Sequence, residues 1–177
     1  MTPSLQLQPV PLTFKVLSAD NVNQLKELNQ RSFPLQYQDS VYSDCLACGD
    51  VSQLAYQDDE LVGGIACRLE VPRGSQAEDT QEAPVEAHLY IMTLAVKEPN
   101  RRQGIGRRLL GQAIVACADD PTITEAYLHV QTSNEEAIQF YHAAGFKSGD
   151  VLRNYYKRVV GPPDALRMYK DLGHGEL

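Results

Sequence analysis

The densest chemical signal in the chain is one short basic run, Arg101-Arg102-Gln103-Gly104-Ile105-Gly106-Arg107-Arg108. It combines four arginines with two closely spaced glycines, and it lies between an expected strand and an expected helix. Glycine lets backbone N–H groups approach an anion closely, and a helix N-terminus adds partial positive charge. The run therefore predicts a cradle for a pyrophosphate group.

Two better-known nucleotide motifs do not fit this run. A Walker loop requires Gly-Lys followed by Ser or Thr, and the run contains no lysine. The dinucleotide fingerprint requires a third glycine three residues after Gly106, where this chain has Leu109. The expected anion site is therefore of another kind.

Alternating strands and helices must position this run. Apolar alternation predicts strands over 12–17, 51–57, 61–71, 87–96 and 122–131. Helical spacing of apolar residues predicts helices over 22–31, 39–47, 104–118 and 134–144. Near the C-terminus, 146–149 and 153–160 suggest a hairpin, and 163–171 suggests a helical turn or two. The order strand–helix–strand–helix–strand favours a layered α/β domain.

The chain length of 177 residues suits one domain. We expect a flexible N-terminal arm over 1–11, the domain over 12–160 and a tail over 161–177. The polar, acidic stretch 72–87 has no periodicity and predicts a solvated loop inserted between two strands.

Composition excludes several classes of protein. With 16 basic and 23 acidic residues the formal net charge is −7, which disfavours general nucleic-acid binding. No apolar run is long enough to span a membrane, and no secretory signal is apparent. The four cysteines are too few and scattered for a disulfide framework. Cys45 and Cys48 form a C-x-x-C pair, but no second pair completes a zinc site, so we expect buried thiols and no metal.

Several motifs together carry a family resemblance. Arg101-x-x-Gly104-x-Gly106 resembles the acetyl-CoA signature of the GNAT superfamily of acetyltransferases. Further segments match in order: Phe33-Pro34-Leu35-x-Tyr37, Leu89-Tyr-Ile-Met-Thr-Leu94, Tyr127-Leu-His-Val-Gln131, Ser133-Asn-Glu135, Ile138-x-Phe-Tyr141, Gly145-Phe146 and Asn154-Tyr-Tyr-Lys-Arg158. Over about residues 12–160 the chain resembles the San-type catalytic subunits of the NatE N-terminal acetyltransferases.

This resemblance implies a fold and a co-substrate site. The fold is a central, mostly antiparallel sheet flanked by helices, with acetyl-CoA wedged where the strands at 88–97 and 123–131 splay apart. Leu94, Ala95 and Val96 would contact the pantetheine arm and thioester. The pyrophosphate would be held by Arg101, Arg102, Gln103, Gly104, Ile105, Gly106 and Arg107. Asn134 and Tyr141 would lie on the far side, with Tyr141 close to the departing sulfur.

Acetyl transfer requires an unprotonated amine, and a peptide α-amino group with a pKa near 7.7–8.0 is mostly protonated at pH 7. His129 is the candidate general base, because imidazole titrates near neutral pH. Tyr90, with an ordinary pKa of about 10, is better suited to ordering a water that relays the proton. The resemblance implies that both are catalytic, bridged by water, and that the amine attacks the thioester directly.

Substrate contacts should come from two aromatic lips. Phe33, Pro34, Leu35 and Tyr37 would form one lip, and Tyr155 and Tyr156 the other, with Met92 as the floor of the pocket. A narrow slot of this kind admits a chain end and hinders a lysine side chain entering from mid-chain. The resemblance implies that the first substrate residue is a retained initiator methionine.

Three alternatives remain open from the sequence. The first is N-terminal acetylation of proteins, the second is acetylation of lysine side chains or small amines on the same fold, and the third is a non-catalytic subunit bound to the NatA complex. The resemblance also implies association with NatA and its ribosome-bound subunit, in the cytoplasm and nucleus. From the charge and the apolar pattern of the chain we expect no nucleic-acid or membrane partner.

Overall fold

A computed structural model describes residues 11–72, 85–157 and 161–173 of the chain. The strands of the described part are β1 (Thr13–Val16), β2 (Gln53–Gln57), β3 (Glu60–Glu70), β4 (Ala87–Val96), β5 (Ile123–Gln131), β6 (Lys147–Leu152) and β7 (Ala165–Asp171). The α-helices are α1 (Val22–Ser32), α2 (Asp39–Ala47), α3 (Ile105–Val115) and α4 (Glu135–Ala143), with short 3-10 turns at Gly49–Val51 and Glu98–Asn100. None of the described helices is long and apolar enough to cross a bilayer.

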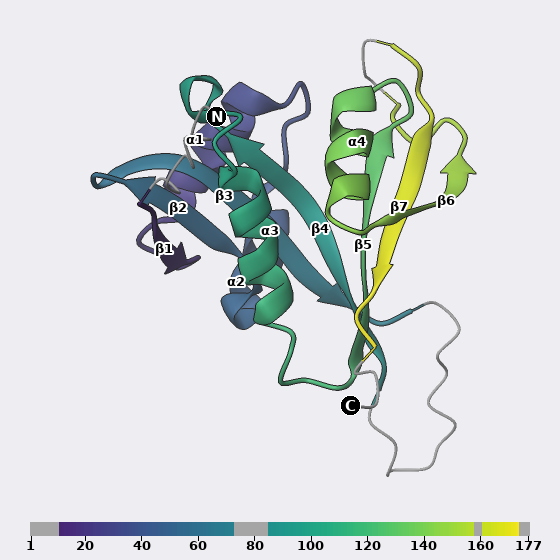
Figure 1. Cartoon of the computed structure of the whole chain (residues 1–177), viewed down its shortest axis with the longest axis horizontal. Coiled ribbons are helices and arrows are strands. Elements are labelled where there is room, and N and C mark those ends of the chain that lie inside the picture. Colours follow the sequence, from purple (N-terminus) through teal and green to yellow (C-terminus); the bar gives the residue numbers. More distant parts are fainter. Residues whose placement is uncertain (1–10, 73–84, 158–160, 174–177) are drawn as a thin grey trace, which may run out of the picture.

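All seven strands form one sheet in the order β1-β2-β3-β4-β5-β7-β6. The pairing is antiparallel everywhere except between β4 and β5, which run parallel. The parallel pair runs from Ala87 opposite Ile123 to Tyr90 opposite Tyr127, although β4 continues to Val96 and β5 to Gln131. Beyond Tyr90 the two strands diverge, as Figure 1 shows, which confirms the expected splay.

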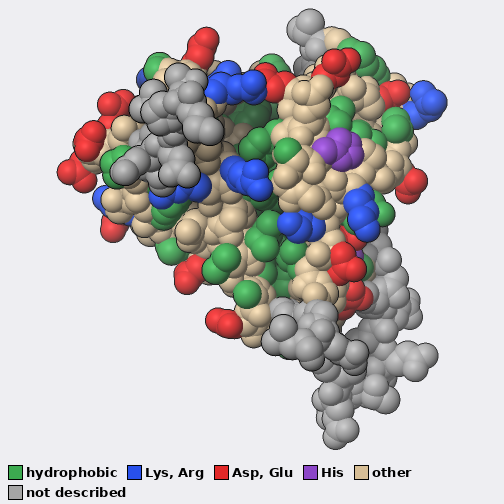
Figure 2. Space-filling view, viewed as in Figure 1, with side chains coloured by type: hydrophobic (Ala, Val, Ile, Leu, Met, Phe, Trp, Pro, Cys, Tyr) green, Lys and Arg blue, Asp and Glu red, His purple; other side chains and the backbone are tan. Residues whose placement is uncertain are grey.

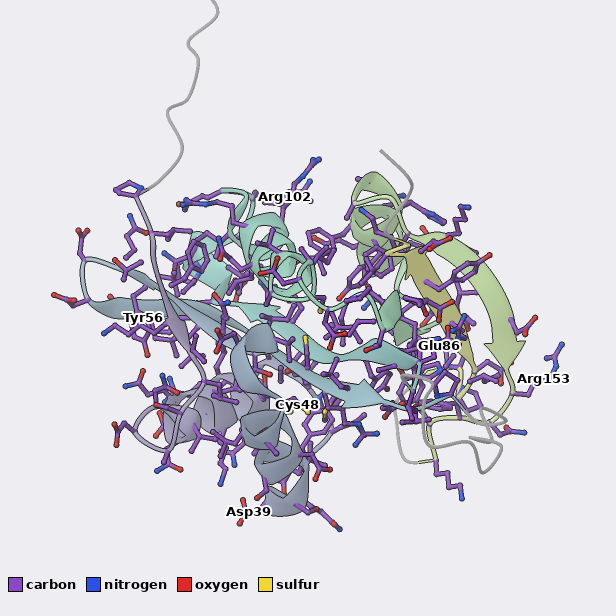
Figure 3. All side chains as sticks on the ribbon, turned by 90° about the horizontal axis from the view of Figure 1, so that it is seen from below. Asp39, Cys48, Tyr56, Glu86, Arg102 and Arg153 are labelled. Carbon is purple, nitrogen blue, oxygen red and sulfur yellow. The ribbon has the colours of Figure 1, made fainter. Side chains whose placement is uncertain are left out.

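Helices cover both faces of the sheet. Figure 3 shows α1 and α2 on one side of the strands and α3 and α4 on the other. On the first side, Leu25 of α1 and Cys45 of α2 pack on Leu54 and Ala66 of the sheet, and all four side chains are buried. On the second side, the apolar stripe of α3 packs on β2, β3 and β4 in the larger core. The two cores hold the splayed strands in place from both faces.

The C-terminal part differs from the sequence prediction. The strand that pairs with β6 is β7, so the expected hairpin partner at 153–160 is wrong: the described residues 153–157 form a turn and loop, and 158–160 lie outside the described residues. The expected helical turns at 163–171 are also wrong, because this segment is a strand between β5 and β6. The sheet therefore continues past residue 160.

The reason lies in the surroundings of β7. Met168 faces the larger core, while Arg167 faces the aromatic rings of Tyr127 and Tyr169. Only Ala165 and Met168 of β7 are buried, and they lie three residues apart, so the segment does not show the period-two alternation typical of a half-exposed strand. The expected arm at 1–11 and acidic loop at 72–87 lie almost entirely outside the described residues.

Candidate active site

The space opened by the splay contains two adjoining cavities. The first cavity, of about 610 Å³, lies between α3 and α4. The second cavity, of about 400 Å³, lies between the diverging parts of β4 and β5 and the loops that follow α1 and β6. Both are lined by Phe33, Leu94, Asn134, Ala137 and Tyr141. A molecule in the first cavity can therefore reach one in the second. Figure 2 shows basic side chains around the hollow between the two halves of the molecule.

The first cavity is built around the N-terminus of α3. Gly104 is the N-cap residue and has a φ of +77°, in the left-handed region that glycine adopts without strain. Arg101 donates from Nε to the carbonyl of Val96 at 3.0 Å, which fixes the loop to the end of β4. Arg102 lies on the α3 side of the sheet in Figure 3 and faces Glu136 of α4 at 3.6 Å. The geometry suits a phosphate group bound by helix-terminal amides and arginines.

Most of the residues expected around the co-substrate line this cavity. They are Leu94, Ala95, Val96, Arg101, Arg102, Gly104, Ile105, Gly106, Arg107, Asn134 and Tyr141. Gln103 is not among the lining residues, and its side chain lies against the carbonyl of Pro99 instead. Asn134 already caps α4, since its Oδ1 accepts a hydrogen bond from the amide of Ala137 at 3.2 Å.

A bulge in β4 shapes the second cavity. Ala66 of β3 pairs with Thr93, but the next residue, Cys67, pairs with Ile91, so Met92 is an extra residue on β4. Bulges bend a strand and leave a residue unpaired, and they recur beside active sites. The Met92 side chain lines the second cavity, and its sulfur lies 3.5 Å from Sγ of Cys45. Burial raises the pKa of the Cys45 thiol to about 11, and all four cysteines are free.

The catalytic pair expected from the sequence meets in the second cavity. The hydroxyl of Tyr90 lies 3.2 Å from Nδ1 of His129, and the ring centroids are 5.6 Å apart. Burial raises the pKa of Tyr90 far above its ordinary value, so the phenol stays protonated and donates to Nδ1. Burial, and then the charge of Arg167, lowers the pKa of His129 below its ordinary value. The imidazole is therefore neutral near pH 7 and can accept a proton.

The two expected lips both line this second cavity. Phe33, Pro34, Leu35 and Tyr37 come from the segment after α1, and Tyr155 and Tyr156 come from the loop between β6 and β7. Phe33 and Tyr37 pack edge to face, with ring centroids 6.4 Å apart. The pKa of Tyr156 is raised to about 12, mainly because the side chain is buried. The cavity thus has rigid aromatic walls with hydroxyl groups at their tips.

Asp164 holds the second lip in place. Its carboxylate accepts a hydrogen bond from the amide of Asn154 at 2.9 Å and faces the guanidinium of Arg153 at 3.3 Å. The backbone amide of Tyr156 donates to the carbonyl of Pro163 at 2.9 Å. The hydroxyl of Tyr156 donates to the backbone carbonyl of His129 at 3.3 Å. These bonds hold Tyr155 and Tyr156 beside His129.

Tyr141 of α4 lies where the two cavities meet. Its side chain is buried, and burial raises its pKa well above the ordinary value, so the phenol remains a hydrogen-bond donor. Tyr141 can therefore donate a hydrogen bond to a group that lies between the two cavities.

Three residues near His129 had no role assigned from the sequence: Tyr127, Glu70 and Arg167. The Tyr127 ring lies 4.9 Å from the Tyr90 ring and 5.8 Å from the His129 ring, and its hydroxyl donates to Glu70. Tyr127 could have been found, because it stands two residues before His129 in a strand and so shares its face. Glu70 and Arg167 come from other strands, and no local pattern indicates them.

Comparisons with known proteins agree with this geometry. The acetyltransferase (GNAT) family matches residues 22–146. N-alpha-acetyltransferase 50 of Danio rerio is 41% identical over 152 residues, which cover 86% of this chain and 83% of the relative. The probable N-acetyltransferase san of Drosophila melanogaster is 38% identical over 152 residues, covering 86% and 76%.

A solved structure is similar over nearly the whole described fold. Arabidopsis thaliana Naa50, in complex with the bisubstrate analogue CoA-Ac-MVNAL, matches with a TM-score of 0.77 and 39% identity, covering 90% of this chain and 97% of that one. The splayed sheet, the arginine–glycine loop and these matches lead to one conclusion: the chain belongs to the acetyltransferase (GNAT) family and, within it, to the Naa50/San-type N-alpha-acetyltransferases.

Proposed function

We propose that the protein transfers the acetyl group of acetyl-CoA to the free α-amino group of protein N-termini that retain methionine, with His129 as general base and Tyr90 as its partner. The observation that carries this proposal is the pair of adjoining cavities with five lining residues in common. One cavity has an anion-binding helix terminus, and the other has a neutral imidazole between aromatic walls. Two substrates that react directly need such a junction.

The related Arabidopsis structure supports the same arrangement. Its ligand joins CoA to a peptide that begins with methionine. The fold match supports the assignment of the first cavity of this chain to CoA and of the second to the peptide. Apolar residues that line the second cavity, including Leu35 and Met92, suit a methionine side chain.

The reaction then needs one proton acceptor and one stabiliser of the leaving group. The amine nitrogen forms a bond to the thioester carbonyl carbon, and its proton passes to Nδ1 of His129 through a water held by the Tyr90 hydroxyl. When the tetrahedral intermediate collapses, the carbon–sulfur bond breaks and the thiolate accepts a hydrogen bond from the Tyr141 phenol. Beyond Tyr90, β4 lacks a pairing partner on its β5 side, so N–H groups near Leu94 and Ala95 are placed to stabilise the oxyanion.

A substrate comparison tests the proposal. Acetyl-CoA is offered with a peptide that begins with Met-Leu and, separately, with the same peptide blocked at its N-terminus and containing an internal lysine. We expect rapid acetylation of the free terminus only, because the lips hinder a side chain from mid-chain. Equal rates on the two peptides would place the activity on lysine side chains instead.

A second measurement separates an enzyme from a non-catalytic subunit. CoA that binds only the folded chain must raise the melting temperature. We expect a rise that grows with CoA concentration, and an unchanged melting temperature would favour the non-catalytic reading. Association with a NatA complex, which the resemblance implies, is part of the proposal and is tested by co-purification with NatA subunits.

A further inference from the structure

Arg167 stands directly opposite His129 in the register of β5 and β7. Its guanidinium lies over the ring of Tyr127, 4.8 Å from the centroid, and over the ring of Tyr169 at 5.3 Å. Its Nη2 forms an ion pair with Glu125, and the side chain is mostly covered. A planar cation stacked on aromatic rings has a defined position as well as a charge.

Tyr127 connects this cation to the catalytic pair. Its ring contacts Tyr90 on one side and presents an edge to His129, with centroid distances of 4.9 and 5.8 Å. Glu70 accepts the hydrogen bond of its hydroxyl, and Arg167 covers its ring. Tyr127 is therefore held at both ends, and it forms the wall against which the Tyr90–His129 contact is made.

The charges around His129 come from several strands. From β3 come Glu70 and Arg68, which pair with each other at 2.6 Å. The phenols of Tyr90, Tyr127 and Tyr155 face the imidazole from β4, β5 and the β6–β7 loop, and the Tyr156 hydroxyl donates to the backbone carbonyl of His129. From β7 comes Arg167. Burial of His129 and the charge of Arg167 lower the pKa of the imidazole, while Glu70 opposes them.

We propose that Arg167 is a positioning residue for the general base: it holds Tyr127 against Tyr90 and His129, and its charge disfavours a second positive charge on the imidazole. This inference rests on the proposed function, in which His129 accepts the proton of the substrate amine. It assigns a role in the reaction to a β7 side chain that contacts neither cavity. The two parts of the role, stacking and charge, can be separated by substitution.

The experiment uses Arg167→Met, which removes the charge and keeps the length, and Arg167→Lys, which keeps the charge and loses the planar stack. Lys147→Met removes one charge from an exposed position of β6 and serves as the control. The titration of His129 is followed by NMR in each protein, with its signal assigned by its loss in His129→Gln. The kcat and KM for acetyl-CoA and a Met-Leu peptide are measured from pH 5.5 to 8.5.

We expect Arg167→Met to raise the midpoint of the His129 titration by roughly half a pH unit, because a nearby positive charge is lost. Its kcat should fall severalfold more at pH 6 than at pH 8, with the KM for acetyl-CoA unchanged. Arg167→Lys should keep the midpoint and lower kcat equally at all pH values. The control should match the unmodified protein in both measurements.

Glu125→Gln provides a check of opposite sign. It removes the carboxylate that pairs with Arg167, so the His129 midpoint should fall. If Arg167→Met does not fold, Glu125→Gln still tests whether the charges of this ion pair act on His129. An unmoved His129 midpoint in folded Arg167→Met or in folded Glu125→Gln overturns the proposal.

The failure of the proposed function has a different signature. If His129→Gln keeps normal turnover, His129 is not the base, and both proposals fall without reference to Arg167. If His129→Gln is inactive and the Arg167 variants behave like the control, only the role of Arg167 is overturned.

Discussion

The hydroxyl of Tyr155 lies 3.2 Å from Nδ1 of His129, the same distance as the hydroxyl of Tyr90. The rings of Tyr155 and His129 are tilted by 33° with centroids 4.6 Å apart, and the two hydroxyls are 3.5 Å apart. One neutral ring nitrogen has one lone pair, so the two phenols share a single acceptor. A tyrosine of the proposed substrate lip thus contacts the nitrogen that we propose as the proton acceptor.

His129→Ala should lower kcat at least about a hundredfold, because proton transfer by a positioned base contributes about that factor or more. The affinity for CoA should change little, since His129 lines the second cavity and not the first. Steady-state kinetics and calorimetric titration with CoA measure the two effects. Normal turnover in this variant would remove His129 from the role of base.

Tyr155→Ala should raise the KM for peptide, because it removes one wall of the second cavity. Phe33→Ala should do the same from the opposite lip. Tyr155→Phe is the matched control, since it keeps the wall and loses only the hydroxyl shared with Tyr90. The KM of Tyr155→Phe should stay close to the normal value. An unchanged KM in both alanine variants would contradict the proposal that the two lips bind the peptide.

The dependence of kcat/KM on pH should show two ionisations on the acid side. The substrate amine loses reactivity below its pKa of about 7.7–8.0, which gives a tenfold fall per pH unit. Because burial and Arg167 lower the pKa of His129, its protonation begins below the ordinary value of 6.5. The slope should therefore steepen to about a hundredfold per unit only below that value. A tenfold slope that continues unbroken to the acid limit of stability would contradict a histidine base.

Gly104→Ala should weaken CoA binding and lower the stability of the chain by about 1 kcal/mol, because an L-residue is strained at a positive φ. No atom lies within 4 Å of the added methyl group, so the effect comes from the backbone and not from a clash. Gly111→Ala, in the middle of α3 and equally open, is the control. It should raise stability by about 0.5–1 kcal/mol and leave CoA binding unchanged. Calorimetry and thermal unfolding measure both, and equal CoA affinities in the two variants would contradict a role for the Gly104 loop.

The sequence predicted the parts of the fold and site that depend on neighbouring residues. Apolar spacing located α1 to α4 and most strands, because periodicity is a property of a short segment. The arginine–glycine run between β4 and α3 located the first cavity for the same reason. The alternation of β5 placed His129 on a strand, and the family resemblance paired it with Tyr90.

Only the tertiary structure decided which distant segments meet. Tyr155 is 26 residues from His129 in the chain, and the loop that carries it is fixed by Asp164 just before β7. The strand β7 itself had no clear signal, because its two buried residues, Ala165 and Met168, lie three residues apart and do not alternate with period two. Strand order and register are set by packing across the whole sheet, and these place Arg167 opposite the base. Local residue types thus determined the chemical groups available, and long-range packing decided their positions and charge states.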